Sequence, residues 1–273
     1  MGRFAFIGRA GAEWTGGAAA CAAAALAILA SGTRPSAAAD VVVFTSGAPA
    51  VVEQMLATAF TEATGNRVLF DVGTVREIQD KLSGSGRPDV VVLPTAALDA
   101  VDKASGLRPG SRIDLARVGI GVVVRAGAPL PDISSADALR KTLLAARSIA
   151  HPDPLGGGFA GAQIVRMFAR LGIADALKPK INLAYALTGG VAQVANGDAE
   201  IGLFNISEIL PVKGVTLVGP LVPELQSYIT FSAALHAGST APEPAAGFLR
   251  ALADPHARDA WRAAGFEPIG GKD

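Results

Sequence analysis

The chain has 273 residues, half of them hydrophobic, and its 24 basic side chains balance its 24 acidic ones. This hydrophobic content excludes a disordered chain, and the zero net charge excludes attraction to nucleic acid or to an anionic membrane through bulk electrostatics. The length suffices for one large domain or two small ones with proper cores.

The N-terminus has the pattern of a secretory signal peptide. Two arginines precede an alanine-rich apolar stretch at 18–30, and Ala37–Ala39 offers the small residues of a cleavage site. The stretch has roughly 13 residues, fewer than the ~20 that a membrane-spanning helix needs. We therefore expect residues 1–39 to be removed on export to the periplasm, with a short membrane anchor as the alternative. Cys21, the one cysteine, lies within the apolar stretch, so the exported chain would carry no thiol.

The next segment alternates between buried strands and helices. Short apolar runs bounded by turn residues predict strands at 41–44, 67–72 and 89–93. Helices are expected to begin near Pro49, Gly73 and Pro94. The first of these should end at Gly65, and its helical spacing predicts a buried face of Val52, Met55, Leu56, Ala59 and Phe60.

A second α/β segment follows. Strands are predicted at 119–125, 147–150, 181–186 and 200–204, and helices at 135–145, 159–171 and 190–196. A further strand at 227–235 precedes helices at 243–253 and 255–264. We expect an α/β fold of two lobes, each a mostly parallel sheet flanked by helices.

The lobe boundaries follow from the order of these elements. Residues 40–117 and 228–273 are assigned to lobe 1, and residues 118–227 to lobe 2. The chain would cross between the lobes near 116–119 and return near 223–227, which makes a two-strand hinge.

Ligands of open α/β sheets bind beyond the carboxyl ends of the strands, where four turns of this chain carry hydroxyls or glycines. They are Thr45-Ser46-Gly47, Gly73-Thr74, the glycine run Gly156–Gly158 after His151, and Thr188-Gly189-Gly190. Helix N-termini at such turns hold oxyanions through free N–H groups, without a basic residue. Each turn alone is better explained by ordinary helix capping, whereas four together favour an anion site.

Two charged or titratable residues adjoin these turns. Arg76 either clamps an anion or pairs with Glu77 or Asp80 on the surface. His151 lies beside Asp153, but two such residues without further ligands are poor grounds for a metal site.

Catalytic and nucleotide-binding motifs are weak. There is no G-x-S-x-G elbow. The run Gly156–Gly161 matches G-x-G-x-x-G, but it lacks the tight turn and the acidic strand end of a dinucleotide site. We assign no catalytic residue, no metal and no cofactor.

The opening strand and turn, the Gly73-Thr74 helix start and the segments 197–205 and 248–266 resemble the molybdate-binding proteins of ABC transporters. The resemblance covers roughly residues 41–266, and it implies a two-lobed periplasmic binding protein that holds an oxyanion with uncharged donors. The implied ligand residues are Ser46, Gly47, Gly73, Thr74, Gly157, Gly158, Thr188 and Gly189, with Asn205 where the family has a tyrosine. Ala48 replaces a usual serine, so a small carboxylate competes with a molybdate-like oxyanion as ligand.

These observations predict a monomeric periplasmic protein that captures a small anion and presents it to a membrane permease of an ABC-type importer. The first alternative is a sensing domain of a membrane receptor, which would use the same binding physics. The second is an enzyme on the same fold, which would need a reactive side chain near the ligand.

Overall fold

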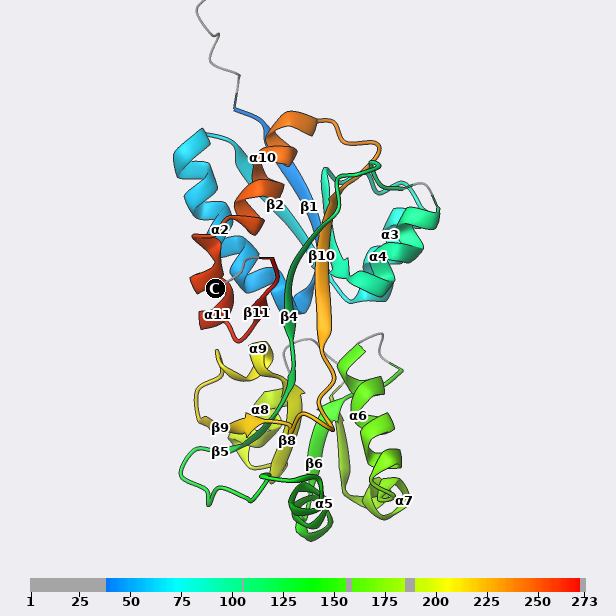
Figure 1. Ribbon diagram of the computed structural model, residues 1–273, viewed down its shortest axis with the longest axis vertical. Helices are drawn as coiled ribbons and strands as arrows, with labels where there is room; N and C mark the ends of the chain where they lie inside the picture. The colour runs from blue at the N-terminus through cyan, green and yellow to red at the C-terminus, as the bar shows by residue number, and fades with distance from the viewer. Residues whose placement is uncertain (1–37, 105, 156–158, 185–189, 271–273) are drawn as a thin grey trace, which may run out of the picture. The chain divides into compact units, whose positions relative to one another are not determined.

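The computed structural model describes residues 38–104, 106–155, 159–184 and 190–270. In this part the chain forms one sheet of six strands and one of five, with helices packed on both, as Figure 1 shows. Only the last two residues of the predicted signal peptide are described. Four of the predicted ligand residues, Gly157, Gly158, Thr188 and Gly189, also lie outside the described residues.

The six-stranded sheet has the order β11-β4-β10-β3-β1-β2. Its parallel strands are β1 (Asp40–Ser46), β2 (Arg67–Gly73) and β3 (Val90–Pro94). Its antiparallel strands are β10 (Ile229–Leu235), β4 (Ile113–Val118) and β11 (Glu267–Pro268). Because β1 is paired on both sides by parallel strands, their carboxyl ends meet at one edge of the sheet.

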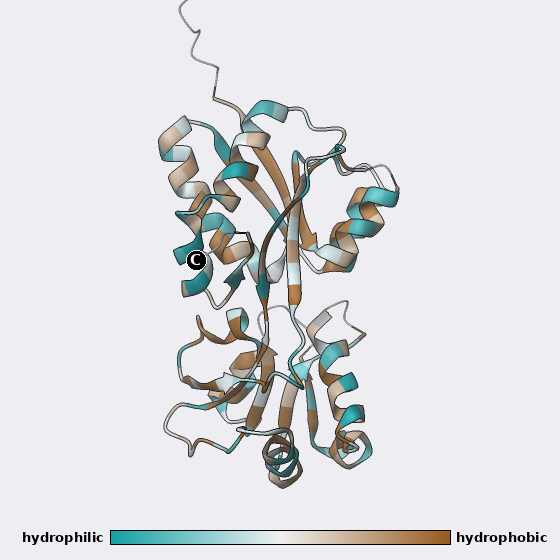
Figure 2. Ribbon diagram, viewed as in Figure 1, coloured by the Kyte–Doolittle hydropathy of each residue, from teal (hydrophilic) through white to brown (hydrophobic). Residues whose placement is uncertain are grey.

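Both faces of this sheet are covered because successive side chains of a strand point to opposite sides. Val90 and Val92 pack with helices α2 (Gly47–Thr64), α10 (Pro242–Ala253) and α11 (Ala257–Ala263). Val91 and Leu93 pack on the other face with α3 (Val75–Ser83) and α4 (Thr95–Lys103). The brown strands of Figure 2 show this apolar interior.

The five-stranded sheet has the order β7-β6-β8-β5-β9. Its parallel strands are β6 (Ile149–Pro152), β7 (Ile181–Ala184) and β8 (Ile201–Asn205), and β5 (Ile120–Arg125) runs antiparallel to both of its neighbours, β8 and β9 (Val215–Pro220). Its helical segments are α5 (Ala136–Ala145), α6 (Phe159–Arg170), α7 (Ala174–Leu177), the 3-10 turn η1 (Lys178–Lys180), α8 (Gly190–Asn196) and α9 (Ile206–Ile209). Gly190 is required where α8 meets the sheet, because a Cβ there would lie 2.3 Å from the Phe204 ring.

The predicted α/β fold of two helix-flanked sheets is confirmed. Each sheet has a parallel core that continues into antiparallel strands, and three of these, β4, β9 and β11, were not expected from the sequence. β9 and β11 are edge strands, and β4 carries the polar residues Asp114 and Arg117, so it lacks the continuous apolar run of a buried strand. The division into lobe 1 (residues 40–117 and 228–273) and lobe 2 (118–227) stays a prediction.

The two connections between the sheets are joined by one side chain. β4 ends at Val118 and β5 begins at Ile120. Gln226, on the returning connection, accepts from the Ile120 N–H at 2.8 Å and donates to its carbonyl at 3.0 Å. The two crossing segments are therefore held in register by a reciprocal amide pair.

Helix α2 differs from its prediction in its start and its buried face. It begins at Gly47, two residues before Pro49, and ends before Gly65, whose φ of 75° is the left-handed conformation that glycine tolerates. The predicted Met55 is 53% exposed, and Ala59 is also exposed. The helix instead buries Pro49, Ala50, Val52, Glu53, Ala57 and Phe60. Apolar residues surround much of this helix, so their spacing did not define one face.

No helix among the described residues combines the length and the hydrophobicity needed to cross a membrane.

Candidate functional site

The carboxyl end of β1 presents a buried serine without a partner. Ser46 is the N-cap residue of α2 and has extended backbone, but its side chain makes no capping hydrogen bond. It is only 5% exposed, and its Oγ has no hydrogen-bond partner. Because the first N–H groups of a helix have no intrahelical acceptor, the first turn of this 18-residue helix also keeps donors for a ligand.

Glu53 lies further along the same helix and is fully buried. Its Oε1 accepts a hydrogen bond from Thr45 Oγ1 at 3.1 Å, whereas its Oε2 has no partner. Burial raises the pKa of Glu53 to about 8, and the hydrogen bond from Thr45 lowers it by less. The side chain is therefore mostly a neutral carboxylic acid at pH 7, with one oxygen available to a ligand.

A second buried acid, Asp89, differs from Glu53 because its hydrogen bonds stabilise the fold. Its oxygens accept from the Val42 N–H, the Ser239 hydroxyl and the backbone N–H groups of Thr240 and Ala241, all within 2.7–3.0 Å. These bonds tie β1 to the segment that enters α10. Glu53 has a single donor by comparison, so its burial is not explained by stabilisation of the fold.

The carboxyl end of β8, like that of β1, presents buried polar atoms without a partner. Asn205 is 4% exposed, and its Nδ2 donates to Glu208 Oε1 at 2.8 Å. This bond fixes Oδ1 as the other end of the amide, and Oδ1 has no partner. The hydroxyl of Ser207, on the following helix α9, is also buried and unpartnered. Burial raises the pKa of Glu208 to about 7, and the hydrogen bonds from Asn205 lower it by less.

These two strand ends come from different sheets, and the helices that follow them are in contact. Helix α9 contacts α2, and Ile206 of α9 packs against the core of the six-stranded sheet. Figure 1 shows α9 at the edge of the five-stranded sheet that faces α2. Within the described residues, all four buried and unpartnered side-chain atoms belong to these two segments: Ser46 Oγ, Glu53 Oε2, Asn205 Oδ1 and Ser207 Oγ.

The strand end after β2, also a predicted ligand turn, is occupied by the chain itself. Thr74 Oγ1 accepts from the Glu77 N–H at 3.2 Å, and the Thr74 N–H donates to Glu77 Oε2 at 2.7 Å. This capping box places a carboxylate at the start of α3, where an anion would bind. A Cβ on the buried Gly73 would meet the same carboxylate at 3.1 Å. An anion contact by Gly73 and Thr74 stays a prediction, in competition with Glu77.

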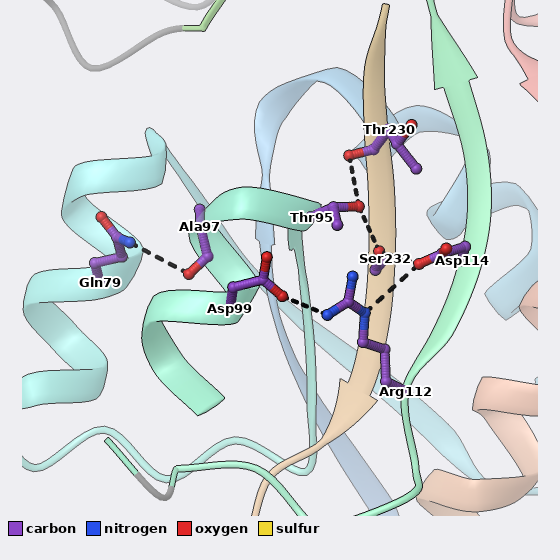
Figure 3. A network of polar contacts seen from close by, with 8 residues as sticks. All are labelled: Gln79, Thr95, Ala97, Asp99, Arg112, Asp114, Thr230 and Ser232. Atoms are coloured by element: carbon purple, nitrogen blue, oxygen red, sulfur yellow. Dashed lines mark hydrogen bonds and ion pairs between the residues drawn. The ribbon is translucent and has the colours of Figure 1, made fainter. Parts of the chain in front are cut away.

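The strand end after β3 is also satisfied internally, as Figure 3 shows. Thr95 Oγ1 donates to the Thr230 carbonyl and lies 2.6 Å from Ser232 Oγ. Ser232 in turn donates to Asp114 at 2.5 Å, and Arg112 pairs with both Asp114 and Asp99. These bonds link α4, β10 and β4, so this strand end braces the fold.

The Arg76 side chain lies on the surface and the His151 side chain lies in the core, and a ligand contact by Arg76 stays a prediction. The Arg76 side chain is 80% exposed and lies 4.0 Å from Asp80. His151 is 2% exposed, and its Nδ1 lies 2.8 Å from the Pro152 carbonyl. Its ring meets Phe168 edge-on, with centroids 5.6 Å apart, and burial lowers its pKa. Within residues 38–270, outside the undescribed gaps, no group of three or more His, Cys, Asp or Glu could hold a metal ion.

The sequence predicted Thr45, Ser46, Gly47 and Asn205 as ligand residues, which stays a prediction, and it did not point to Glu53, Ser207 or Glu208. A signal for Glu53 was present, because helical spacing puts it on the same face as Ala57 and Phe60. An acidic residue within a buried helical stripe is unusual unless it is paired.

The family model of the bacterial extracellular solute-binding proteins matches residues 41–267. The chain belongs to this family. This solute-binding protein is 32% identical over 221 residues to an aconitate isomerase from Pseudomonas sp., a match that covers 78% of this chain and 82% of that protein.

Solved structures of oxyanion-binding proteins share the fold. The periplasmic molybdate-binding protein of Azotobacter vinelandii has a TM-score of 0.71 at 20% identity, over 85% of this chain and 100% of that one. The sulfate-binding protein of Mycobacterium tuberculosis has a TM-score of 0.67 at 19% identity, over 85% and 87% of the two chains. The resemblance expected from the sequence is thus confirmed for family and fold, while identities this low establish no ligand.

The family description also bears on location and on catalysis. It makes the chain an extracellular solute-binding protein, in agreement with the predicted export. It describes binding rather than chemistry, whereas the relative from Pseudomonas sp. carries the name of an enzyme. The identity of the ligand and the presence of an enzymatic activity are therefore separate questions.

Proposed function

We propose that this protein captures a small carboxylate-bearing acid outside the cytoplasm, between the carboxyl ends of β1 and β8, and presents it to the membrane permease of an ABC-type importer. The observation that carries the proposal is the gathering of four buried, unpartnered polar atoms on these two segments. An unsatisfied buried polar group costs about 1–3 kcal/mol. A ligand that pairs with several of them recovers that cost, which favours the bound state.

The kinds of polar atom favour a carboxylic or hydroxy acid over molybdate or sulfate. The Ser46 hydroxyl, the first turn of α2 and a neutral Glu53 can donate to a carboxylate. Asn205 Oδ1 can only accept, because Nδ2 is directed to Glu208. A fully ionised oxyanion has no hydrogen for Oδ1, whereas an acid that keeps one O–H group does.

The comparison with a sequence relative supports the same ligand class. The match to the aconitate isomerase from Pseudomonas sp. is 32% identical. Aconitate is a small tricarboxylate. The molybdate- and sulfate-binding proteins share the fold at 20% and 19% identity, so the name of the sequence relative is the stronger guide to the ligand.

The test is a ligand panel applied to the full chain by calorimetry and thermal unfolding. The panel holds cis- and trans-aconitate, citrate, succinate, acetate, molybdate, tungstate and sulfate. A ligand at a hundredfold its dissociation constant adds about 2.7 kcal/mol to stability, which raises the melting temperature by several degrees. Shifts with carboxylates and none with the metal oxyanions are expected. A shift with molybdate or tungstate alone would overturn the proposal.

Transport and sensing are separated by a second experiment, since both use the same binding site. Deletion of the gene in its native host should abolish uptake of the ligand from dilute solution if the protein serves an importer. Normal uptake together with a lost transcriptional response to the ligand would indicate a sensing domain instead.

A further inference from the structure

The placement of two carboxyl groups at the proposed site suits them to proton transfer as well as to ligand binding. Glu53 belongs to α2 and Glu208 to α9, two helices in contact that start at the ends of β1 and β8. Glu53 is held by one uncharged donor, Thr45 Oγ1, and Glu208 is held by one residue, Asn205, through its Nδ2 and its backbone N–H. Within the described residues neither takes part in an ion pair.

Glu53 differs from an acid whose hydrogen bonds stabilise the fold. Asp89 is saturated by four donors, whereas Glu53 is fully buried and leaves Oε2 unpartnered. A carboxyl group that is oriented by one hydrogen bond and free at its other oxygen can exchange a proton with a bound molecule. On the facing segment, Glu208 is also held by one residue, Asn205, and is partly buried.

The surroundings bring the pKa values of both carboxyl groups close to neutral pH. Burial raises the pKa of Glu53 to about 8 and that of Glu208 to about 7. At pH 7 the first is mostly an acid, and the second is divided between acid and base. General acid–base catalysis works best when pKa values lie near the working pH, and paired groups with different values divide the two roles.

We propose that Glu208 and Glu53 act as base and acid in moving a carbon–carbon double bond of a captured unsaturated carboxylate. This inference rests on the proposed function, because the same two segments must first hold the acid. It extends that function from capture to isomerisation, with the acid–base residues named.

The step balances without an oxidant, reductant or cofactor. The ionised carboxylate of Glu208 removes a proton from the methylene carbon next to the double bond, and the freed electron pair forms a new double bond. The electron pair of the original double bond takes a proton from Glu53 at its far carbon. Glu208 ends protonated and Glu53 ionised, so the pair is set for the reverse transfer or resets by exchange with water.

The neighbouring groups suit this reaction. Negative charge spreads onto the substrate carboxylate as the proton leaves. The first turn of α2 carries the positive end of the helix dipole, and the Ser46 hydroxyl lies at its start. In aconitate a methylene carbon, a double bond and three carboxylates occur together, so the displaced double bond regenerates aconitate, in the same or the opposite geometry.

The experiment uses the full chain with cis- or trans-aconitate in D₂O, followed by proton NMR, with binding measured in parallel by calorimetry. Interconversion of the isomers with deuterium appearing on the methylene carbon is the expected result. Glu53→Gln and Glu208→Gln should each slow it 10²–10⁴-fold, the usual range for loss of an acid or base. Glutamine keeps the shape and a hydrogen-bonding group, so binding should change only a few-fold.

Two exposed glutamates of the same chain provide matched controls, and three outcomes would overturn the inference. Glu62→Gln, on the exposed side of α2, and Glu224→Gln, exposed near the five-stranded sheet, should leave the rate unchanged. Binding without isomerisation or deuterium incorporation by the wild-type chain overturns this inference and leaves the proposed function standing. Full activity of folded Glu53→Gln and Glu208→Gln also overturns it. Absence of binding to both isomers overturns the inference together with aconitate as a ligand.

Discussion

Thr45 donates a hydrogen bond to Oε1 of Glu53 over 3.1 Å, and the other carboxyl oxygen of Glu53 has no hydrogen-bond partner within the described residues. The pair connects the last residues of β1 to the second turn of α2. It orients a fully buried acid toward the strand end where Ser46 is also unpartnered. The predictions below separate what these groups contribute to folding from what they contribute to ligand binding.

The first prediction concerns Glu53 and pH. Its folded pKa of about 8 lies above the ordinary 4.5, so the native state holds a proton that the unfolded chain releases. Stability from this group is therefore complete below pH 4.5 and is lost as pH rises toward 8, by at most about 1.4 kcal/mol per pH unit. Glu53→Gln should unfold at a higher temperature than the wild type at pH 8 and at a similar one at pH 5.

Thermal unfolding between pH 5 and pH 8.5 checks this prediction. Glu62→Gln, an exposed substitution on the same helix, should keep the wild-type pH dependence. A Glu53→Gln protein that is less stable than the wild type at pH 8 would show that the carboxylate is ionised and stabilising in the fold.

The second prediction compares two buried serines. Ser232→Ala removes a hydroxyl that bonds Asp114 and Thr95, so it should lower the free energy of unfolding by about 1–3 kcal/mol and leave ligand affinity unchanged. Ser46→Ala removes a hydroxyl with no protein partner, so stability should stay the same or rise. Its ligand affinity should fall about tenfold. Urea unfolding and calorimetry measure both quantities, and equal loss of stability in the two variants would contradict the prediction.

The third prediction tests the amide at the end of β8. Asn205→Asp replaces the donor to Glu208 with a second acid, and two adjacent carboxylates disfavour both an anionic ligand and each other's ionisation. Affinity for a carboxylate ligand should fall at least tenfold at pH 7 and recover partly at pH 5. Asn196→Asp, an exposed change on α8, serves as the control. Unchanged affinity of Asn205→Asp by calorimetry would place the ligand elsewhere.

The fourth prediction treats His151 as a packing residue. Burial lowers its pKa, so its stabilising effect is complete above pH 6.5, the ordinary value, and is lost as pH falls and the unfolded chain gains a proton. His151→Asn keeps a donor near the Pro152 carbonyl and cannot be protonated. It should flatten the acid side of the stability curve, leave ligand affinity within about twofold, and leave any isomerisation unchanged. His256→Asn, at an exposed position, should alter none of these. A large loss of activity in His151→Asn would show that this histidine takes part in the reaction.

Local patterns in the sequence were enough to predict the α/β fold, and they singled out residues at the ends of β1 and β8 that stay predicted ligand residues. The apolar runs of β1, β3 and β8 are buried on both faces, so they are visible without any knowledge of their neighbours. Thr45, Ser46 and Asn205 could be placed because they directly follow such runs. The antiparallel strand β4 was missed because its pairing with β10 joins residues more than a hundred positions apart.

The acid–base groups, in contrast, are a product of the tertiary structure. Glu53 and Glu208 have no motif around them, and a glutamate on a helix is ordinarily exposed. Packing α2 against the six-stranded sheet buries Glu53, and Glu208 is partly buried on α9, the helix that contacts α2. The sequence by itself determined the elements and their order, because these depend on neighbouring residues. Only the tertiary structure decided which carboxyl groups lose water, because desolvation depends on segments that are distant along the chain.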